Sequence, residues 1–273
     1  MKLLSGILGL TLSSVAALAS ANAADMYRAS EAGGYKDGYA PTAVWTGFYA
    51  GVNAGYESAN WQARPTLIDP GFIQAYQAYL PPQLTKDFSD SGALGGFQIG
   101  YNYQSGRLVL GVEADYDFSD LKASRDTGVI AGPFPTPVHN AQFTEKADSQ
   151  NLATVRGRLG AAFDNFLIYG TGGLAVTAAH FSPGVTLLNG TQPYSGSGAS
   201  ETKTGWVAGG GVEFMLNSAW SIKAEYLHAD FGSESARLAD GAGAVIDSKA
   251  SLTTDTVRGG INYHVGNVYE PLK

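Results

Sequence analysis

The sequence contains no cysteine, and only 15% of its residues are charged. Without cysteine, a disulfide framework, a thiol nucleophile and a thiolate metal site are all excluded. The formal net charge of −7 argues against a nucleic-acid partner, because such partners are bound through clustered Lys and Arg. After residue 23, no apolar run approaches the ~20 residues that a membrane helix needs. A mature chain that enters a bilayer must therefore form a closed barrel, since only helices and closed barrels satisfy every backbone polar group in lipid.

The N-terminus has the pattern of a secretory signal peptide. Lys2 supplies a positive charge, residues 3–18 are largely apolar, and residues 21–23 read Ala-Asn-Ala. This arrangement predicts cleavage between Ala23 and Ala24. An uncleaved membrane anchor is not favoured, because the run is short and no stop-transfer charges follow it. We therefore expect a signal peptide (1–23), a periplasmic lead-in segment without a fold of its own (24–44), a barrel (45–265) and a short C-terminal tail (266–273).

Eight segments alternate apolar with polar or small residues at the period of two that is typical of β-strands. The clearest runs over 108–118, where Leu110 and Val112 lie on one face and Glu113 and Asp115 on the other. The two faces of the fifth segment are too similar for its orientation to be predicted. The segments are 48–56, 93–103, 108–118, 153–163, 166–178, 206–214, 220–226 and 256–265.

The connections between these segments alternate in length. The pairs Ser105-Gly106, Asp164-Asn165 and Asn217-Ser218 predict three tight turns. Short periplasmic turns and long external loops are typical of outer-membrane barrels, whereas loops this long are uncommon in a compact soluble domain. The four long segments between the turns, which we expect to be external loops, are 57–92, 119–149, 180–203 and 230–253.

Aromatic residues gather near both ends of the strands, as in the interfacial girdles of membrane barrels. We therefore predict an all-β fold, an eight-stranded antiparallel transmembrane up-and-down β-barrel. A soluble eight-stranded barrel of lipocalin type is the alternative, and it would place the apolar face inside. Phe48, Tyr103, Phe163, Phe214, Trp220 and Tyr263 fall near the periplasmic ends, and Tyr56, Tyr116, Phe118 and Trp206 near the outer ends.

The first strand segment, 45–56, reads Trp-Thr-Gly-Phe-Tyr-Ala-Gly-Val-Asn-Ala-Gly-Tyr and resembles the RopB-type outer-membrane proteins of alphaproteobacteria. Segments 169–175, 205–213, 223–226 and 256–263 resemble later strands of that family in the same order. The resemblance spans the signal peptide and the strands but not the loops. It implies an opacity-type or OmpA-type barrel, a surface antigen of the Gram-negative cell envelope tied to envelope integrity and host contact, in a family often labelled porins. The tail, 266–273, differs from the family pattern, because many outer-membrane proteins end on an aromatic residue that the assembly machinery recognises.

Nine charged residues fall on the strand faces that we assign to the lumen. Eight strands leave an interior just wide enough for side chains to fill it. We therefore expect a salt-bridged plug in which buried charges satisfy one another in pairs. An ion pathway through the same charges is the alternative. This lumen charge network comprises Glu113, Asp115, Asp117, Arg156, Arg158, Glu213, Lys223, Glu225 and Arg258.

The histidines give no sign of a catalytic or cofactor site. His139, His180 and His228 fall in or beside the predicted external loops, and His264 lies at a periplasmic strand end. No Ser-x-His pattern occupies one strand face, and catalysis needs a converging nucleophile and base. We therefore predict no enzyme activity, no catalytic residue, no metal and no cofactor. A haem-binding surface protein that uses the three loop histidines and an outer-membrane lipid enzyme are the less favoured alternatives.

These observations predict an outer-membrane protein with a structural role in envelope integrity and a surface-interaction role. A narrow general porin that passes small solutes is the alternative. Apolar residues in the segments 68–84 and 130–138 favour contact with a partner or with lipopolysaccharide, and packing of the loops against one another is the competing interpretation. The expected partners are outer-membrane lipid and lipopolysaccharide, the barrel assembly machinery and host surface ligands, with no nucleic acid.

Overall fold

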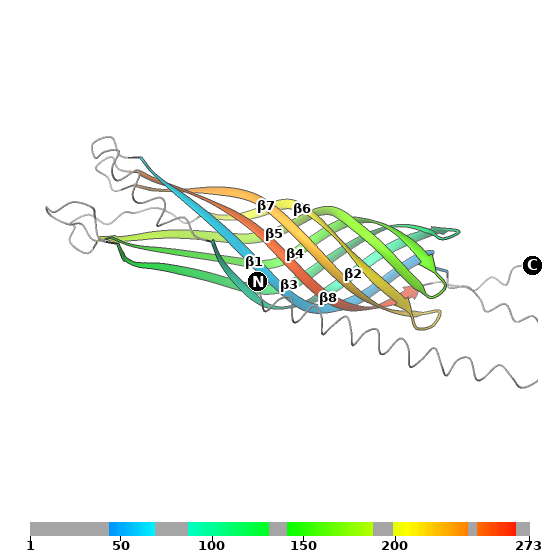
Figure 1. Ribbon diagram of the computed structural model, residues 1–273. Helices are drawn as coiled ribbons and strands as arrows, with labels where there is room; N and C mark the ends of the chain where they lie inside the picture. The colour runs from blue at the N-terminus through cyan, green and yellow to red at the C-terminus, as the bar shows by residue number, and fades with distance from the viewer. Residues whose placement is uncertain (1–43, 69–86, 131–140, 188–198, 240–244, 266–273) are drawn as a thin grey trace, which may run out of the picture. The chain divides into compact units, whose positions relative to one another are not determined.

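The chain forms a closed β-barrel. The structure is a computed structural model that describes residues 44–68, 87–130, 141–187, 199–239 and 245–265. Within these ranges each strand is antiparallel to its neighbours, and β8 pairs with β1 to close the ring (Figure 1). The predicted eight-stranded antiparallel barrel is confirmed. The strands are β1 (Gly47–Ile68), β2 (Asp87–Ser105), β3 (Leu108–Ile130), β4 (Ala141–Phe163), β5 (Phe166–Leu187), β6 (Ala199–Met215), β7 (Trp220–Ala239) and β8 (Val245–Val265).

Among the described residues, no helix is long and apolar enough to cross a membrane.

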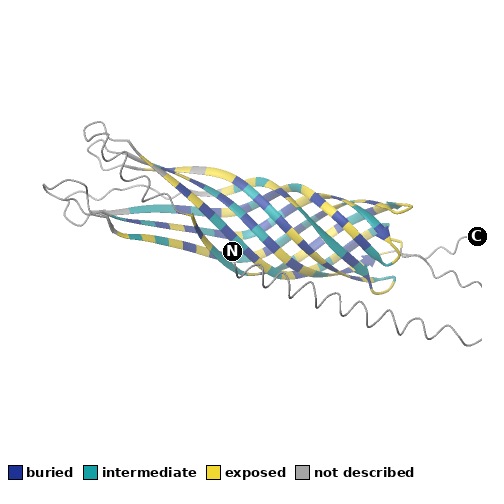
Figure 2. Ribbon diagram, in the orientation of Figure 1, coloured by how far each residue is buried: buried dark blue, intermediate teal, exposed yellow. Residues whose placement is uncertain are grey.

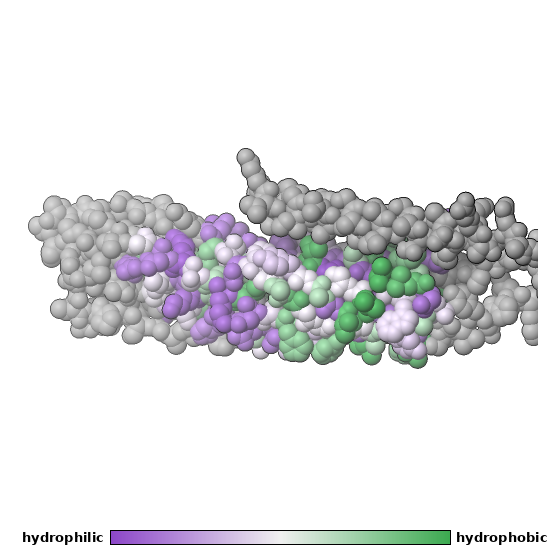
Figure 3. All heavy atoms as spheres, turned by 90° about the horizontal axis from the view of Figure 1, so that it is seen from below, coloured by the Kyte–Doolittle hydropathy of each residue, from purple (hydrophilic) through white to green (hydrophobic). Residues whose placement is uncertain are grey.

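In the half of the barrel that carries the tight turns, apolar side chains face outward and polar side chains face inward. Figure 2 shows the alternation of buried and exposed residues along the strands, and Figure 3 shows hydrophobic residues gathered on part of the outer surface. On β3, Val112 is 60% exposed whereas the adjacent Glu113 is 1% exposed. A soluble lipocalin-type barrel would reverse this pattern, so the arrangement is that of a barrel in lipid. The fifth strand is now oriented, because Leu167 and Tyr169 point inward and Leu174 points outward.

The strands are longer than the sequence analysis predicts. They contain 17 to 23 residues and run far into the segments assigned to loops. The loop assignment is wrong for these residues because the pattern reverses beyond the apolar band. There, apolar side chains face inward and polar side chains face outward. On β1, Ala59 and Trp61 are buried in the interior while Asn60 and Gln62 face outward. We call this part of the barrel the extension; it comprises 57–68, 87–94, 119–130, 141–150, 176–187, 199–205, 227–239 and 245–255.

The extension consists of two four-stranded sheets. Within the described residues, pairing of β2 with β3 stops at Gly95 and Phe118, and pairing of β6 with β7 stops at Trp206 and Asp230. All other neighbouring pairs continue further, so β7-β8-β1-β2 form one sheet and β3-β4-β5-β6 the other. In Figure 1 the strands part toward this end. The edges of β2, β3, β6 and β7 are therefore without a strand partner over this part of the described chain.

Two β-bulges change which residues face inward within the extension. The register of β4 with β5 shifts at Asn151, whose φ is +53°. Leu152 and Ser149 both face inward although they are three residues apart, so the inward positions are even-numbered on one side of the bulge and odd-numbered on the other. The register of β7 with β8 shifts between Asp230 and Ser233, where Gly232 has a φ of +68°. Glycine adopts this left-handed conformation without steric cost, which suits it to a bulge. A fixed period of two therefore does not follow either strand along its whole length.

Candidate functional site in the barrel interior

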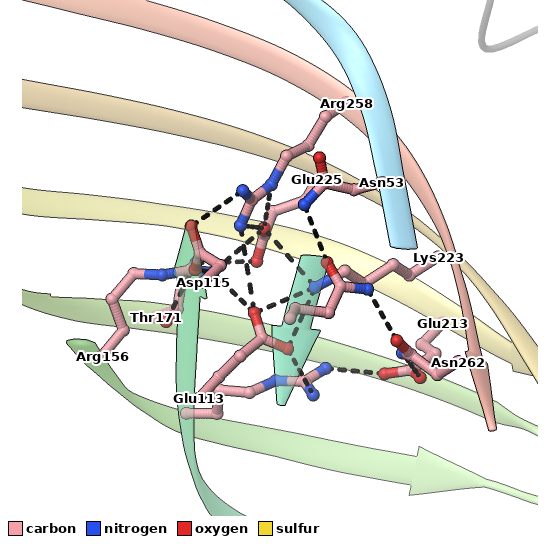
Figure 4. Close-up of polar contacts among 12 residues, drawn as sticks. Asn53, Glu113, Asp115, Arg156, Thr171, Glu213, Lys223, Glu225, Arg258 and Asn262 are labelled. Atoms are coloured by element: carbon pink, nitrogen blue, oxygen red, sulfur yellow. Dashed lines mark hydrogen bonds and ion pairs between the residues drawn. The ribbon is translucent and has the colours of Figure 1, made fainter. Parts of the chain in front are cut away.

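The nine lumen charges predicted from the sequence all lie inside the barrel. Each is exposed over 6% or less of its surface. They share one face because successive side chains of a strand point to opposite sides. Their charged groups converge in the middle of the barrel (Figure 4). We call these residues the charge layer: Glu113, Asp115 and Asp117 on β3, Arg156 and Arg158 on β4, Glu213 on β6, Lys223 and Glu225 on β7, and Arg258 on β8.

Arg156 contacts three carboxylates from two strands. Its Nη2 lies 2.6 Å from Glu113 and 2.7 Å from Asp115, both on β3. Its Nη1 lies 2.9 Å from Glu225 on β7, and its Nε donates to the hydroxyl of Thr154 at 2.9 Å. A guanidinium group offers several donors in a fixed plane, so one Arg can hold several carboxylates together.

Two further cations connect strands that are distant in the ring. Lys223 of β7 donates to Glu113 of β3 at 2.9 Å, and these two strands lie on opposite sides of the barrel. Arg258 of β8 lies 2.9 Å from Asp115 on β3 and 2.8 Å from Glu225 on β7. These side chains therefore extend across the lumen instead of lying along its wall.

Arg158 is held by a carboxylate and by two aromatic side chains. Its Nη2 lies 2.7 Å from Glu213, and its Nη1 donates to the hydroxyl of Tyr49 at 2.6 Å. That hydroxyl donates in turn to Glu113 at 2.7 Å. The guanidinium carbon lies 3.9 Å from the centre of the Tyr169 ring, which adds a cation–π contact.

Neutral amides extend this network to β1 and β2. Gln98 of β2 donates to Asn262 of β8 at 2.6 Å and accepts a hydrogen bond from Asn53 of β1 at 3.1 Å. Asn262 donates to Glu213 of β6 at 2.7 Å. These amides are not among the predicted site residues, although their position on the polar faces of the alternation is the signal that identifies them. Together with Tyr169 of β5, the contacts involve all eight strands.

Apolar clusters lie on both sides of the charge layer along the barrel axis. Toward the tight turns, one buried cluster includes Trp45, Val109 and Met215. Toward the extension, a larger buried cluster includes Trp61 and Phe181. A hydrated path along the described barrel would have to cross both apolar clusters as well as the charge layer.

The histidines do not converge. His180 and His228 lie in β5 and β7, which corrects their expected position in or beside loops, and His139 lies outside the described residues. The His180 Nε2 lies 2.8 Å from the hydroxyl of Ser182, and the two residues form a His-x-Ser pair on one strand face, in the reverse order to Ser-x-His. His228 contacts Asp255 at 2.8 Å. In the part of the chain that the structure describes, no group of three or more His, Asp or Glu side chains has an arrangement that could hold a metal ion.

Two ion pairs of the extension lie outside the membrane band. Arg125 and Glu145 face inward with their charged groups 3.2 Å apart. Burial raises the pKa of Glu145, and the nearby guanidinium offsets this rise in part. On the outer surface, a hydrogen bond from Arg237 lowers the pKa of Asp247.

A closed ring with apolar side chains outside and a filled polar interior defines a membrane β-barrel of the outer-membrane type. Residues 5–264 match the family described as outer membrane protein beta-barrel domain, and the chain belongs to this family. The 31 kDa outer-membrane immunogenic protein of Brucella melitensis biotype 1 is 32% identical over 82% of this chain and 88% of its own length. The 22 kDa outer membrane protein of Rhizobium leguminosarum bv. viciae is 26% identical over 71% of this chain and 68% of its own length.

The solved structures that the chain is similar to are more distant in sequence. The outer membrane protein OprG from Pseudomonas aeruginosa is 12% identical, with a TM-score of 0.42, and the match covers 82% of this chain and 99% of OprG.

The relatives confirm the predicted resemblance to alphaproteobacterial outer-membrane barrels and the predicted location in the outer membrane. They fit a structural and surface-interaction role, and the porin alternative is not favoured over it. The two relatives are named as outer-membrane proteins and not as enzymes. The predicted cleavage between Ala23 and Ala24, the lead-in segment 24–44 and the tail 266–273 lie outside the described residues.

Proposed function

We propose that the protein is a closed structural barrel of the outer membrane that contributes to envelope integrity and contacts partners through its extension. The observation that supports this proposal best is the contact of Lys223 with Glu113 across the lumen at 2.9 Å. Side chains from opposite strands meet there and fill the space that a general porin keeps open to water.

The energetics of the charge layer support a dry interior. Removing one partner of a buried ion pair costs roughly 3–5 kcal/mol, because the other charge is left uncompensated. Arg156 alone contacts Glu113, Asp115 and Glu225. A displacement that opened the lumen would break several such contacts together, so the closed state is strongly preferred.

The extension supports the surface-interaction part of the proposal. Its outward side chains are largely polar, and within the described residues the edges of β2, β3, β6 and β7 have no neighbouring strand over part of their length, although the backbone N–H of Lys122 on β3 donates to Asp90 of β2. Unpaired strand edges are templates for pairing with another extended chain. Lipopolysaccharide is a second proposed partner, since the exposed Tyr56, Phe118 and Trp206 lie near the outer edge of the apolar band. We also propose the barrel assembly machinery as the route of insertion and host surface ligands as partners of the outer loops.

We further propose that the protein is not an enzyme. A Ser–His pair becomes a nucleophile and base when a third group orients the histidine. Asp148 is in register with His180, but no hydrogen bond joins them among the described residues. The contact of Ser182 with His180 is therefore that of two neighbouring side chains on a strand surface.

Planar-bilayer conductance of the refolded protein tests the closed barrel directly. We expect no large, steady openings from the natural chain. Replacing Lys223 and Arg258 by Ala removes two side chains that cross the lumen and should raise the frequency of short openings, whereas Ile222→Ala, on the lipid-facing side of β7, should not. Large, steady and frequent openings of the natural chain would contradict the proposal and support a porin.

A further inference from the structure

Two neighbouring strands of the extension place like charges directly opposite one another. Arg64 of β1 is in register with Lys249 of β8, and both side chains are exposed on the outer surface. Like charges directly opposite each other destabilise a sheet. Among the described residues, neither side chain has an ion-pair or hydrogen-bond partner. We call these two residues the basic pair; their arrangement is unfavourable in the isolated chain and favours an anion that comes from outside it.

The acids closest to the basic pair do not neutralise it. Asp247, the next outward residue of β8 toward the end of the extension, accepts hydrogen bonds from Arg237 at 2.8 and 3.0 Å. Asp87 of β2 is in register with Gln62, one outward position closer to the membrane, and no ion pair joins it to Arg64 among the described residues. Two positive charges without an ion pair therefore lie on this surface, although the whole chain has a formal net charge of −7.

Between the basic pair and the apolar band, amides and hydroxyls predominate on the outer face of β7, β8 and β1. Gln62, Ser251 and Ser233 form one row across the three strands. Asn60 and Thr253 lie in the next row toward the band. All five side chains face outward. Groups of this kind both donate and accept hydrogen bonds, as the hydroxyls of sugars require.

The two acids of this face that lie nearer the band are engaged within the chain. Asp230 accepts a hydrogen bond from the backbone N–H of Gly232 at 2.8 Å. Asp255 accepts one from the hydroxyl of Tyr226 at 2.5 Å and contacts His228 at 2.8 Å. Their oxygens thus have partners, whereas the basic pair has none among the described residues.

The other sheet of the extension compensates its outward charges. On β3, Lys122 lies 2.7 Å from Asp120 and is in register with Asp148 of β4. Lys146 of β4 is in register with serines on both neighbouring strands. Across the strand pairs that the structure describes, the basic pair is the one place where like charges are directly opposed.

We propose that the basic pair binds the anionic core sugars of lipopolysaccharide, and that the amides and hydroxyls below it contact neighbouring sugar hydroxyls. Arg64 follows Tyr56 by eight residues, which at ~3.3 Å per residue and a tilt of about 45° places it roughly 19 Å beyond the outer aromatic level. The acyl chains of lipopolysaccharide lie in the apolar band and its phosphate- and carboxylate-bearing sugars lie above it. Guanidinium and ammonium groups bind such anions through charge-assisted hydrogen bonds. This inference rests on the proposed function, in which the extension faces the medium.

The experiment is a titration of the refolded full mature chain in a zwitterionic detergent. The two ligands are rough lipopolysaccharide, which retains the core sugars, and lipid A, which lacks them, and calorimetry measures both dissociation constants. Arg64→Gln combined with Lys249→Gln should weaken the binding of rough lipopolysaccharide about tenfold, because each exposed charge contact contributes a few-fold in affinity. The binding of lipid A should not change. Without ligand, this double variant should have a slightly higher urea midpoint than the natural chain, because the repulsion between the two cations is removed.

Lys122→Gln combined with Lys146→Gln is the matched control, since it removes two exposed cations from the other sheet and changes the net charge equally. This variant should bind both ligands as the natural chain does. Equal weakening by the two double variants would overturn the site and leave only a general effect of net charge. A natural chain that binds rough lipopolysaccharide no more tightly than lipid A would overturn the contact with the core sugars. Tighter binding of heparin than of rough lipopolysaccharide would assign the basic pair to a soluble polyanion instead.

The titration is independent of the direction in which the barrel is inserted, because the chain is in detergent. Insertion is tested separately by maleimide labelling of Gln62→Cys on intact cells. Labelling of this residue, together with equal affinities of the natural chain and the Arg64 and Lys249 double variant, would overturn the basic pair alone and leave the proposed function intact. Weaker binding by that variant without labelling of Gln62→Cys would overturn the proposed orientation, and with it lipopolysaccharide as the ligand in the cell.

Discussion

Lys223 and Glu113 come from opposite strands of the barrel, β7 and β3, and their side chains meet at 2.9 Å in its interior. Glu113 also contacts Arg156 at 2.6 Å and the hydroxyl of Tyr49 at 2.7 Å. The carboxylate of Glu113 is thus a common acceptor for groups from three other strands. The strands are held together across the lumen as well as through their backbone hydrogen bonds.

The first prediction concerns the coupling between Lys223 and Glu113. Lys223→Met should destabilise the barrel by roughly 3–5 kcal/mol, because it leaves carboxylates uncompensated in a buried setting. Lys223→Met combined with Glu113→Gln should be more stable than the sum of the two single changes predicts. Urea unfolding of the refolded variants measures both quantities.

The control for this cycle is the pair Lys122 and Asp120 on the outside of β3. Their charged groups are 2.7 Å apart, but both side chains are more than half exposed. A solvated pair of this kind contributes about 0–1 kcal/mol, so its coupling should be small. Equal coupling energies for the two pairs would mean that the interior is wet.

Much of the fold follows from the sequence because lipid imposes a simple rule on each strand. Apolar residues must face the bilayer, so parity along a strand such as 108–118 determines that Glu113 and Asp115 face inward. The three tight turns are visible for a similar reason, since pairs such as Asp164-Asn165 favour turn conformations. Asp164 indeed has a φ of +50° between β4 and β5.

The extension was missed because the rule that identifies the membrane strands does not apply beyond lipid. Its inward residues are apolar and its outward residues polar, as with Trp61 and Gln62. The bulges at Asn151 and Gly232 also interrupt the period of two. Which side chains meet across the lumen, as Lys223 and Glu113 do, depends on how far each strand is offset from its neighbours around the ring. The residue pattern within one strand does not reveal this offset.

A second prediction concerns the space that a glycine leaves for an aromatic ring. A Cβ on Gly100 would lie 2.3 Å from the hydroxyl of Tyr49, whereas a Cβ on Gly157 would meet nothing closer than 3.8 Å. Gly100→Ala should therefore displace Tyr49 from Glu113 and Arg158 and destabilise the barrel by about 1–3 kcal/mol, as overpacking does. Gly157→Ala, on the lipid-facing side of β4, should be close to neutral. Urea midpoints compare the two, and equal losses would contradict the close packing of Tyr49.

The third prediction concerns the pH dependence of Glu145. Its raised pKa means that the folded chain binds this proton more tightly than the unfolded chain does. The contribution of Glu145 to stability is therefore fully present below the pKa of the unfolded chain and is lost as pH rises through the raised pKa of the folded state. Glu145→Gln imitates the protonated form, so its stability relative to the natural chain should increase from acidic to neutral pH.

The exposed Asp247 provides a control of opposite sign. Its lowered pKa contributes stability that is present above the unfolded pKa and is lost as pH falls through the folded pKa. Asp247→Asn should therefore become slightly less stable than the natural chain as pH rises. Urea midpoints across the acidic range measure both variants, and parallel curves for Glu145→Gln and the natural chain would contradict the effect of burial.

The last prediction separates strand from loop in the extension, and the absence of native cysteine makes the measurement clean. Gln62 and Ala63 are adjacent on β1, but Gln62 is exposed outside and Ala63 is buried inside. A membrane-impermeant maleimide applied to intact cells should label Gln62→Cys and leave Ala63→Cys unlabelled. In a loop both positions would be accessible, so labelling of both would contradict the strand.

The same reagent tests the direction in which the barrel is inserted. The tight turns and the extension lie at opposite ends of the strands, so only one of these ends can face the medium. Ser105→Cys, Asn165→Cys and Ser218→Cys lie in or beside the tight turns, and they should react only after the outer membrane is broken. Cysteines placed at 77, 132, 190 and 241, in the long connections outside the described residues, should react on intact cells. Labelling of a turn site on intact cells would show that the barrel is inserted in the opposite direction, with the extension in the periplasm and the surface role excluded.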